Sequence, residues 1–200
     1  MLGAERHPLL IVGSDPLEVD RLLVGGELRC PDCAGELRPW GHARERRVRD
    51  LHAVVRLRPR RSSCSRCCGT HVLLPAWTLC RRADAAVVIG QALLAKAGGA
   101  GHRSIAVLLD RPPSTVRGWL RRFGVRAELL RVLFTSLLHA LDACAAAVTV
   151  TGSVFSDALE ALGSAAAAAA RLFGPRPAWQ FASAASAGLL LGPGAAANTS

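Results

Sequence analysis

A six-residue pattern that occurs twice constrains this chain more than any other feature. The first copy runs from Cys30 to Gly35, the second runs from Cys64 to Gly69, and both read C-x-x-C-x-G. A turn of this kind points two thiolates at one spot, and we expect its glycine to adopt a positive φ so that the backbone curls around the sulfurs. Two such turns supply four sulfurs, which is the closed tetrahedral shell of a structural zinc ion.

The repeat also predicts which cysteines are the ligands of one structural Zn²⁺. Cys68 stands where the first copy has Ala34, so the expected ligands are the paired positions Cys30, Cys33, Cys64 and Cys67. The 30 residues between the two pairs exceed the usual zinc-ribbon spacing and would have to form a long hairpin. Two disulfides, or unrelated buried cysteines, are the alternatives. Nothing marks the chain as secreted, which favours reduced thiols and a metal site.

Positive charge is concentrated in the middle of the chain. Between Arg29 and Arg131 there are 21 Lys and Arg against 7 Asp and Glu, whereas the remaining residues hold 4 basic and 8 acidic side chains. The central net charge of +14 predicts a polyanionic partner, with phosphates as the obvious candidate. A GC-rich genome explains why arginine is used instead of lysine, since Lys96 is the only lysine, but it does not explain why the excess is central.

The N-terminus carries only a short apolar stretch after an acidic residue, which predicts neither a signal peptide nor a transmembrane span. We therefore expect a cytoplasmic protein with no membrane partner, which would be associated with the nucleoid if its polyanionic partner is DNA.

The residue pattern predicts a mainly α fold with a small β zinc ribbon, an α+β architecture. Five segments are expected along the chain. They are an N-terminal strand and helix (1–27), a zinc ribbon (28–76), a helix-turn-helix (83–125), alanine-rich helices (126–173) and a largely disordered tail (174–200). In the first segment Ser14 or Asp15 can cap a short helix. In the fourth, Leu129, Val132 and Leu133 belong to an apolar stripe that could pack on the preceding helices or on a second subunit.

An alternating run within the ribbon places three arginines on one face of a strand, namely Arg56, Arg58 and Arg60. Pro59 argues that this is an edge strand. Such a strand could lie along a phosphate backbone, or its charges could simply protect a solvated edge.

Residues 84–123 fit the helix-turn-helix template. Asp84 is expected to cap the first helix and Gly124 to end the third. The positions that fall on the buried side are Ile105, Ala106, Leu109, Val116 and Trp119. Asp110 replaces the usual turn glycine, which is tolerable because Asp can adopt left-handed conformations. Arg111 replaces an apolar residue and is expected to leave the turn less well anchored.

Six side chains of this motif are the predicted DNA-binding residues. Ser114, Arg117 and Arg121 would face base edges in the major groove. The other three would contact phosphates, and they are Arg103, Thr115 and Arg122.

The ribbon also resembles the N-terminal zinc ribbon of several insertion-sequence transposases, through residues 30–33, 44–51 and 60–67. Residues 105–106, 115–117 and 119–122 look like the helix-turn-helix that follows it there. About residues 8–185 resemble an uncharacterised actinobacterial family with the same layout, including residues 37–42 and 71–75. The resemblance implies DNA binding in or near mobile elements.

No catalytic residues are expected. Past Gly124 the carboxylates are few and lie on predicted helices, so the metal-binding triad of a complete transposase is missing. Cys80 and Cys144 lack a plausible base nearby in sequence. The sequence therefore predicts a non-enzymatic, sequence-specific binder of double-stranded DNA, either a transcriptional regulator or the DNA-recognition part of a mobile element. Further candidate partners are a transposase or a second copy joined through the C-terminal helices. An RNA-binding zinc-ribbon protein and a zinc-stapled protein-protein adaptor remain as alternatives.

Overall fold

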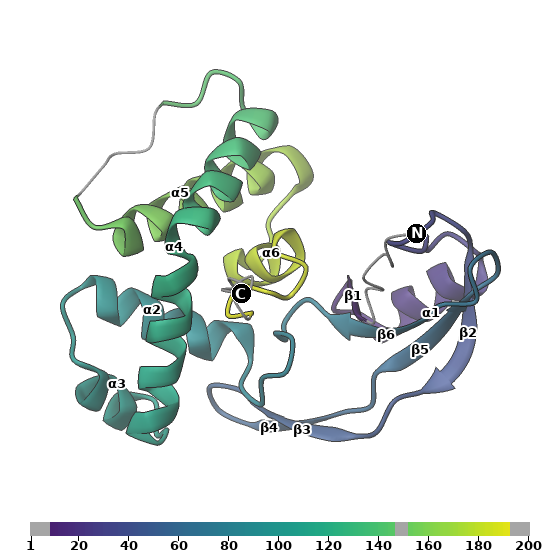
Figure 1. Cartoon of the computed structure of the whole chain (residues 1–200), viewed down its shortest axis with the longest axis horizontal. Coiled ribbons are helices and arrows are strands. Elements are labelled where there is room, and N and C mark those ends of the chain that lie inside the picture. Colours follow the sequence, from purple (N-terminus) through teal and green to yellow (C-terminus); the bar gives the residue numbers. More distant parts are fainter. Residues whose placement is uncertain (1–8, 147–151, 193–200) are drawn as a thin grey trace, which may run out of the picture.

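A small sheet at one end and a group of helices at the other make up a mixed α/β fold (Figure 1). The computed structural model describes residues 9–146 and 152–192. Within these residues there are six helices and six strands. None of the described helices is both long and apolar enough to cross a membrane.

The four-stranded sheet has the order β1-β6-β5-β2, in which β1 and β6 are parallel and the other neighbours are antiparallel. Its strands are β1 (Leu9–Val12), β2 (Leu37–His42), β5 (Arg60–Cys64) and β6 (Thr70–Pro75). Between β1 and β2 lies α1 (Pro16–Val24), which begins where the sequence predicted because the Asp15 carboxylate accepts a hydrogen bond from the N–H of Leu17.

A separate two-stranded hairpin, formed by β3 (Arg46–Arg49) and β4 (Val54–Leu57), extends from the sheet toward the helices (Figure 1). The predicted edge strand through Pro59 is therefore wrong. Pro59 is buried between two strands, β4 ends before it, and β5 begins after it in the interior of the sheet. A proline has no N–H to donate to a ladder, so the change of sheet occurs at this residue. Arg60 leaves the predicted arginine row and pairs with Asp20 at 2.7 Å.

The helical part begins with α2 (Ala86–Ala97) and α3 (His102–Leu108), followed by α4 (Pro113–Leu141), which is continuous over 29 residues. Gly124 does not end a helix, contrary to the sequence-based prediction. A glycine in a helix interior costs only about 1 kcal/mol relative to alanine. That cost is smaller than the gain from burying one apolar stripe along the whole helix, formed by Val116, Trp119, Phe123, Ala127, Leu130, Phe134 and Leu138.

This buried stripe differs from the predicted one. Leu129 and Val132 are 56% and 50% exposed, because the stripe that starts at Val116 continues through Leu130 and Phe134. Leu133 is only partly buried. In a single continuous helix, the residues buried at one end determine which residues are buried at the other. Two separate helices could each bury a different side.

The C-terminal helices are α5 (Val154–Phe173), as predicted, and α6 (Ala178–Ala185), which lies in the segment expected to be disordered. That expectation is wrong for residues 178–192, because α6 packs on α2 and the side chains of Leu190 and Leu191 are fully buried in the helical core. Gly90 permits this packing, since a methyl group there would overlap the indole of Trp179. Residues 1–8, 147–151 and 193–200, on which parts of the segment predictions fall, lie outside the described residues.

Candidate metal centre and arginine surface

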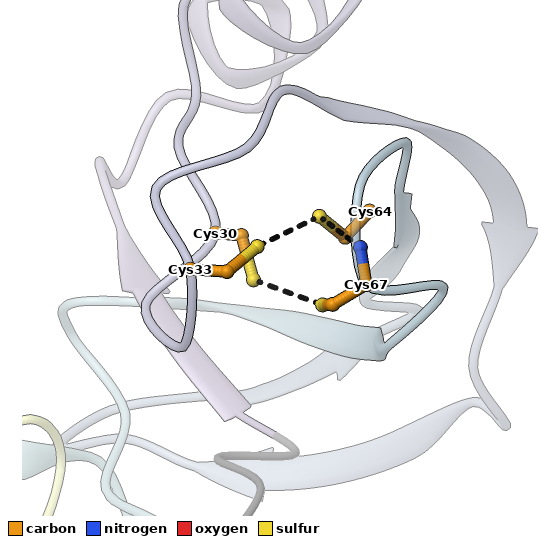
Figure 2. A group of neighbouring side chains, drawn as sticks. All are labelled: Cys30, Cys33, Cys64 and Cys67. Carbon is orange, nitrogen blue, oxygen red and sulfur yellow. Dashed lines mark hydrogen bonds between the residues drawn. The ribbon is translucent and has the colours of Figure 1, made fainter.

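Four cysteine side chains meet at one point (Figure 2). Cys30 and Cys33 come from the loop before β2, Cys64 is the last residue of β5, and Cys67 lies in the loop that follows it. The sulfurs of Cys33 and Cys64 are 3.4 Å apart, and those of Cys30 and Cys67 are 3.7 Å apart. All four lie within 4.8 Å of one another. The repeated pattern therefore predicted which four side chains gather, and Cys68 is not among them.

The distances fit a single metal ion and not a pair of disulfides. Zinc–thiolate bonds of about 2.3 Å arranged as a tetrahedron hold the sulfurs about 3.8 Å apart, whereas a disulfide requires about 2.05 Å. All seven cysteines are free thiols in the structure. The chemistry of the four sulfurs and their spacing both fit a cation bound between them.

The two cysteine loops have the same backbone hydrogen bonds. In each copy the N–H of the first cysteine donates to the carbonyl of the glycine, from Cys30 to Gly35 and from Cys64 to Gly69, at 2.8 Å. The carbonyl of the first cysteine accepts from the fifth residue of the pattern, which is Ala34 or Cys68. The sequence repeat is therefore a structural repeat.

The glycines are required for a reason other than the one predicted from sequence. The residues with positive φ are Ala34 (57°) and Cys68 (58°), not the glycines that follow them. A Cβ at Gly35 would lie 2.9 Å from the Cys64 sulfur, and one at Gly69 would lie 3.3 Å from the Cys67 sulfur. The glycines therefore leave room for the sulfurs, and the residue before each glycine adopts the left-handed conformation.

The surroundings of Cys64 and Cys30 shift the pKa values of their thiols in opposite directions. The N–H of Cys67 and then that of Arg66 point at the Cys64 sulfur, at 3.5 and 3.3 Å, and they lower the pKa of this thiol to about 6. Burial raises the pKa of the Cys30 thiol above its ordinary value. A cation between the sulfurs would favour the thiolate form at both positions.

His71 is a neighbour of this cluster that the sequence reasoning placed on a strand and did not connect with the cysteines. It is fully buried, and its Nε2 atom lies 3.4 Å from the Cys30 sulfur. Asp32 lies close to the same pair. Groups that contact metal ligands from behind orient them, so His71 belongs to the surroundings of the candidate centre. The position of His71, two residues after the second cysteine loop, was the one sequence signal that could have indicated its proximity to the cysteines.

Asp84 joins the hairpin to the helices and does not cap α2 as predicted, since Ala85 occupies the cap position. One carboxylate oxygen of Asp84 accepts from Arg49 of β3 and the other from Arg111 of the α3–α4 turn, both at 2.7 Å. The Asp84 side chain is 3% exposed and that of Arg111 is 10% exposed. We call these three residues the Asp84 clasp.

Arg111 therefore anchors the turn between α3 and α4, contrary to the expectation that it would loosen it. It also donates to the carbonyls of Leu109 and Asp110, and to that of Asp50 at the tip of the β3–β4 hairpin. Asp110 has a φ of 50°, which confirms the left-handed conformation expected at this place. Of the apolar residues predicted to be buried around the turn, Ile105, Ala106, Val116 and Trp119 are buried, whereas Leu109 is only partly buried.

The six side chains predicted to bind DNA lie on the outside of α3 and α4. Arg103 is exposed in the first turn of α3, and Ser114 is exposed in the first turn of α4, whereas Thr115 is half-buried. Arg117 and Arg121 are exposed on the side of α4 opposite its buried stripe. Arg122 is exposed as well, and its guanidinium folds back over Gly118.

No family model, curated protein or solved structure matches this chain.

Proposed function

We propose that the four cysteines hold one structural Zn²⁺ and that residues 28–76 form a zinc ribbon. The support is the close approach of the four sulfurs, all within 4.8 Å of one another, together with the matching hydrogen bonds of the two cysteine loops. Four thiolates would fill all four positions around a tetrahedral zinc ion and leave none open for water or a substrate, which fits a structural and not a catalytic ion. Metal analysis of the purified protein should give one zinc per chain. A protein that stays folded and metal-free in a strong chelator would contradict this proposal.

We further propose that the protein binds duplex DNA sequence-specifically, with α3 and α4 acting as a helix-turn-helix. The observation that carries the proposal is the outer face of the first turns of α4. Arg117 and Arg121 lie there, and among the described residues neither has an acidic partner within ion-pair distance. Arg131, farther along the same helix, differs from them because its charge is already paired with Glu128. Unpaired arginines on an exposed helix are suited to phosphates and to the edge of guanine.

The roles of the six residues follow from their positions. Ser114, Arg117 and Arg121 share the side of α4 that points away from the core, so they would face base edges when the helix enters the major groove. The remaining three would contact phosphates, Arg103 from α3, and Thr115 and Arg122 from a shared side of α4.

The biological setting that fits best is a transcriptional regulator or the DNA-recognition component of a mobile element. This setting is what the expected similarity of the cysteine and helix motifs to those of insertion-sequence transposases would imply. A transposase or a second copy of the chain would then be the protein partner.

The test is selection of bound sequences from random duplex DNA with the zinc-loaded protein. Arg117→Ala should relax the preference at one or two base pairs, because a bidentate contact to guanine discriminates by about 1–3 kcal/mol. Arg131→Ala removes the same charge from the same helix and serves as the control, with no expected change in the selected sequence. An unchanged preference in Arg117→Ala would show that α4 does not read bases.

Charge reversal at both positions separates this proposal from the two alternatives. Arg117→Glu with Arg121→Glu should abolish duplex DNA binding while leaving the fold intact, since both side chains are exposed. An RNA-binding ribbon protein would keep its RNA affinity in this variant. A protein-protein adaptor would show no nucleic-acid affinity before or after the change.

A further inference from the structure

The exposed face of the β3–β4 hairpin carries arginines that repel one another. Arg47 and Arg56 are directly opposite in the antiparallel ladder, and both are exposed. Like charges in this arrangement destabilise a strand pair. None of the ion pairs within the described residues involves either of them. The free protein therefore keeps an unfavourable contact that a bound anion would turn into a favourable one.

The two faces of this hairpin differ in a way that separates structure from binding. Val48 is fully buried in the helical core and Leu57 packs against it, so one face holds the hairpin in place. The opposite face carries Arg47 and Arg49 on β3 and Arg56 on β4, because alternate residues of a strand point the same way. The second face is the one that presents arginines to a partner.

A concave site lies on the arginine face. A hollow of about 300 Å³ is lined by Arg47, Arg49, Val54 and Ala83. The Nε atom of Arg49 is buried and has no hydrogen-bond partner among the described residues, although its Nη2 donates to Asp84. The free positive charge at the hollow comes from Arg47, which is exposed and has no acidic partner among the described residues, and this charge suits a phosphate group.

The Asp84 clasp fixes this site relative to α4. Arg49 belongs to both the hollow and the clasp, and Arg111 links the clasp to the hairpin tip through the carbonyl of Asp50 at 3.2 Å. The hairpin tip consequently lies against the turn that precedes α4 (Figure 1). A rigid connection of this kind allows two separate elements to bind one duplex.

We propose that the β3–β4 hairpin is a second DNA-contacting element, which binds backbone phosphates beside the base pairs read by α4 through Arg47, Arg49 and Arg56. This inference rests on the proposed function. It deepens that function by adding a contact that carries affinity and register but no sequence information. A hairpin that contacts phosphates extends the bound site beyond the base pairs that α4 covers.

The experiment compares two duplexes centred on the selected sequence, one that just covers the base pairs read by α4 and one with ten further base pairs on each side. The zinc-loaded wild-type protein should bind the longer duplex more tightly. Arg47→Ala with Arg56→Ala should lose that gain and flatten the salt dependence by about one unit of slope per lost contact. Arg21→Ala with Arg38→Ala removes two exposed arginines that already have acidic partners and should keep the gain.

Two further readouts sharpen the test. The hairpin variant should select the same sequence as the wild type, and its melting temperature without DNA should rise because the cross-strand repulsion is gone. The inference would be overturned if the length-dependent gain survived in the hairpin variant or if the control lost it equally. It would also be overturned if the wild-type protein bound single-stranded RNA more tightly than duplex DNA. If Arg117→Ala leaves the selected sequence unchanged while the hairpin variant still loses the length gain, the proposed reading by α4 fails and the phosphate site stands.

Discussion

The sheet end and the helical end of this protein are stabilised in different ways. Among the described residues, the helical core contains 26 buried apolar residues, namely Val48 of the hairpin and 25 more between Leu79 and Leu191. The separate core of the sheet has six, and two of them are Cys30 and Cys64. A core of that size rarely supplies enough stability by itself, so small domains add a metal or a disulfide. The comparison teaches that packing can stabilise the helical end by itself, whereas the sheet end needs the cross-link that we propose at its four cysteines.

Loss of the metal should have the largest effect, and only at the sheet end. Cys64→Ser should unfold the ribbon, since structural zinc contributes on the order of 10 kcal/mol in small domains. Backbone hydrogen exchange should show lost protection in β2, β5 and β6, with protection retained in α2, α4 and α5. Cys144→Ser, at an exposed cysteine outside the cluster, is the control. A uniform loss along the chain would mean that the two ends are one cooperative unit.

The reciprocal change removes packing from the helical end. Phe134 is fully buried in the middle of the α4 stripe, and Phe134→Ala should lower the free energy of unfolding by about 3–5 kcal/mol. Urea denaturation followed by helical circular dichroism measures this loss, while the zinc content should stay at one per chain. Leu129→Ala on the exposed side of the same helix should change stability by less than about 0.5 kcal/mol.

Mutation of the Asp84 clasp tests whether the stability of the hairpin is coupled to that of the helical end. Asp84→Asn leaves the Arg111 guanidinium enclosed without its carboxylate, and removal of one partner of a buried pair costs about 3 kcal/mol. We expect exchange protection to fall at Arg49 and in the α3–α4 turn before it falls elsewhere. Equal destabilisation of all elements would show that the clasp supports the whole fold and not this junction.

The smallest predicted effect distinguishes the left-handed residues from the ligands. Cys68 adopts a φ of 58°, so Cys68→Gly should stabilise the protein by about 0.5 kcal/mol, the net of relieved backbone strain and the higher entropy of glycine in the unfolded chain. Cys68→Ser should be nearly neutral, with full zinc content. Loss of zinc in either variant would place Cys68 among the ligands.

Features set by local spacing could be predicted from the sequence. The four gathered cysteines follow from a repeated turn, and the burial of Ile105, Val116 and Trp119 follows from helical periodicity around a short loop. In both cases the residues that determine the geometry lie within a few positions of one another.

Features that depend on residues distant in the sequence could not be predicted in this way. Asp84 has the sequence signature of a helix cap, and only the folded chain brings Arg49 and Arg111 to it from 35 and 27 positions away. Gly124 has the signature of a helix end, but burial of Phe134 and its neighbours along the same stripe favours continuation. The small residues after Gly174 suggested disorder. The prediction failed because the surfaces that bury Leu190 and Leu191 are formed by distant parts of the chain.

The segment around α6 also has a consequence for the order in which this protein assembles. The Ser14 hydroxyl donates to the Gln180 side chain across 166 positions, and Gly188 lies against Ile11 of β1. A ribosome adds roughly 5–20 residues per second, so about 6–20 seconds separate the synthesis of Cys67 from that of Gln180. All four thiols are therefore exposed to the cell's metal supply well before the C-terminal segment can cover β1. If the four cysteines hold the proposed zinc, we expect metal binding to precede the closing of the fold, with all four ligands synthesised while the helical core is still incomplete.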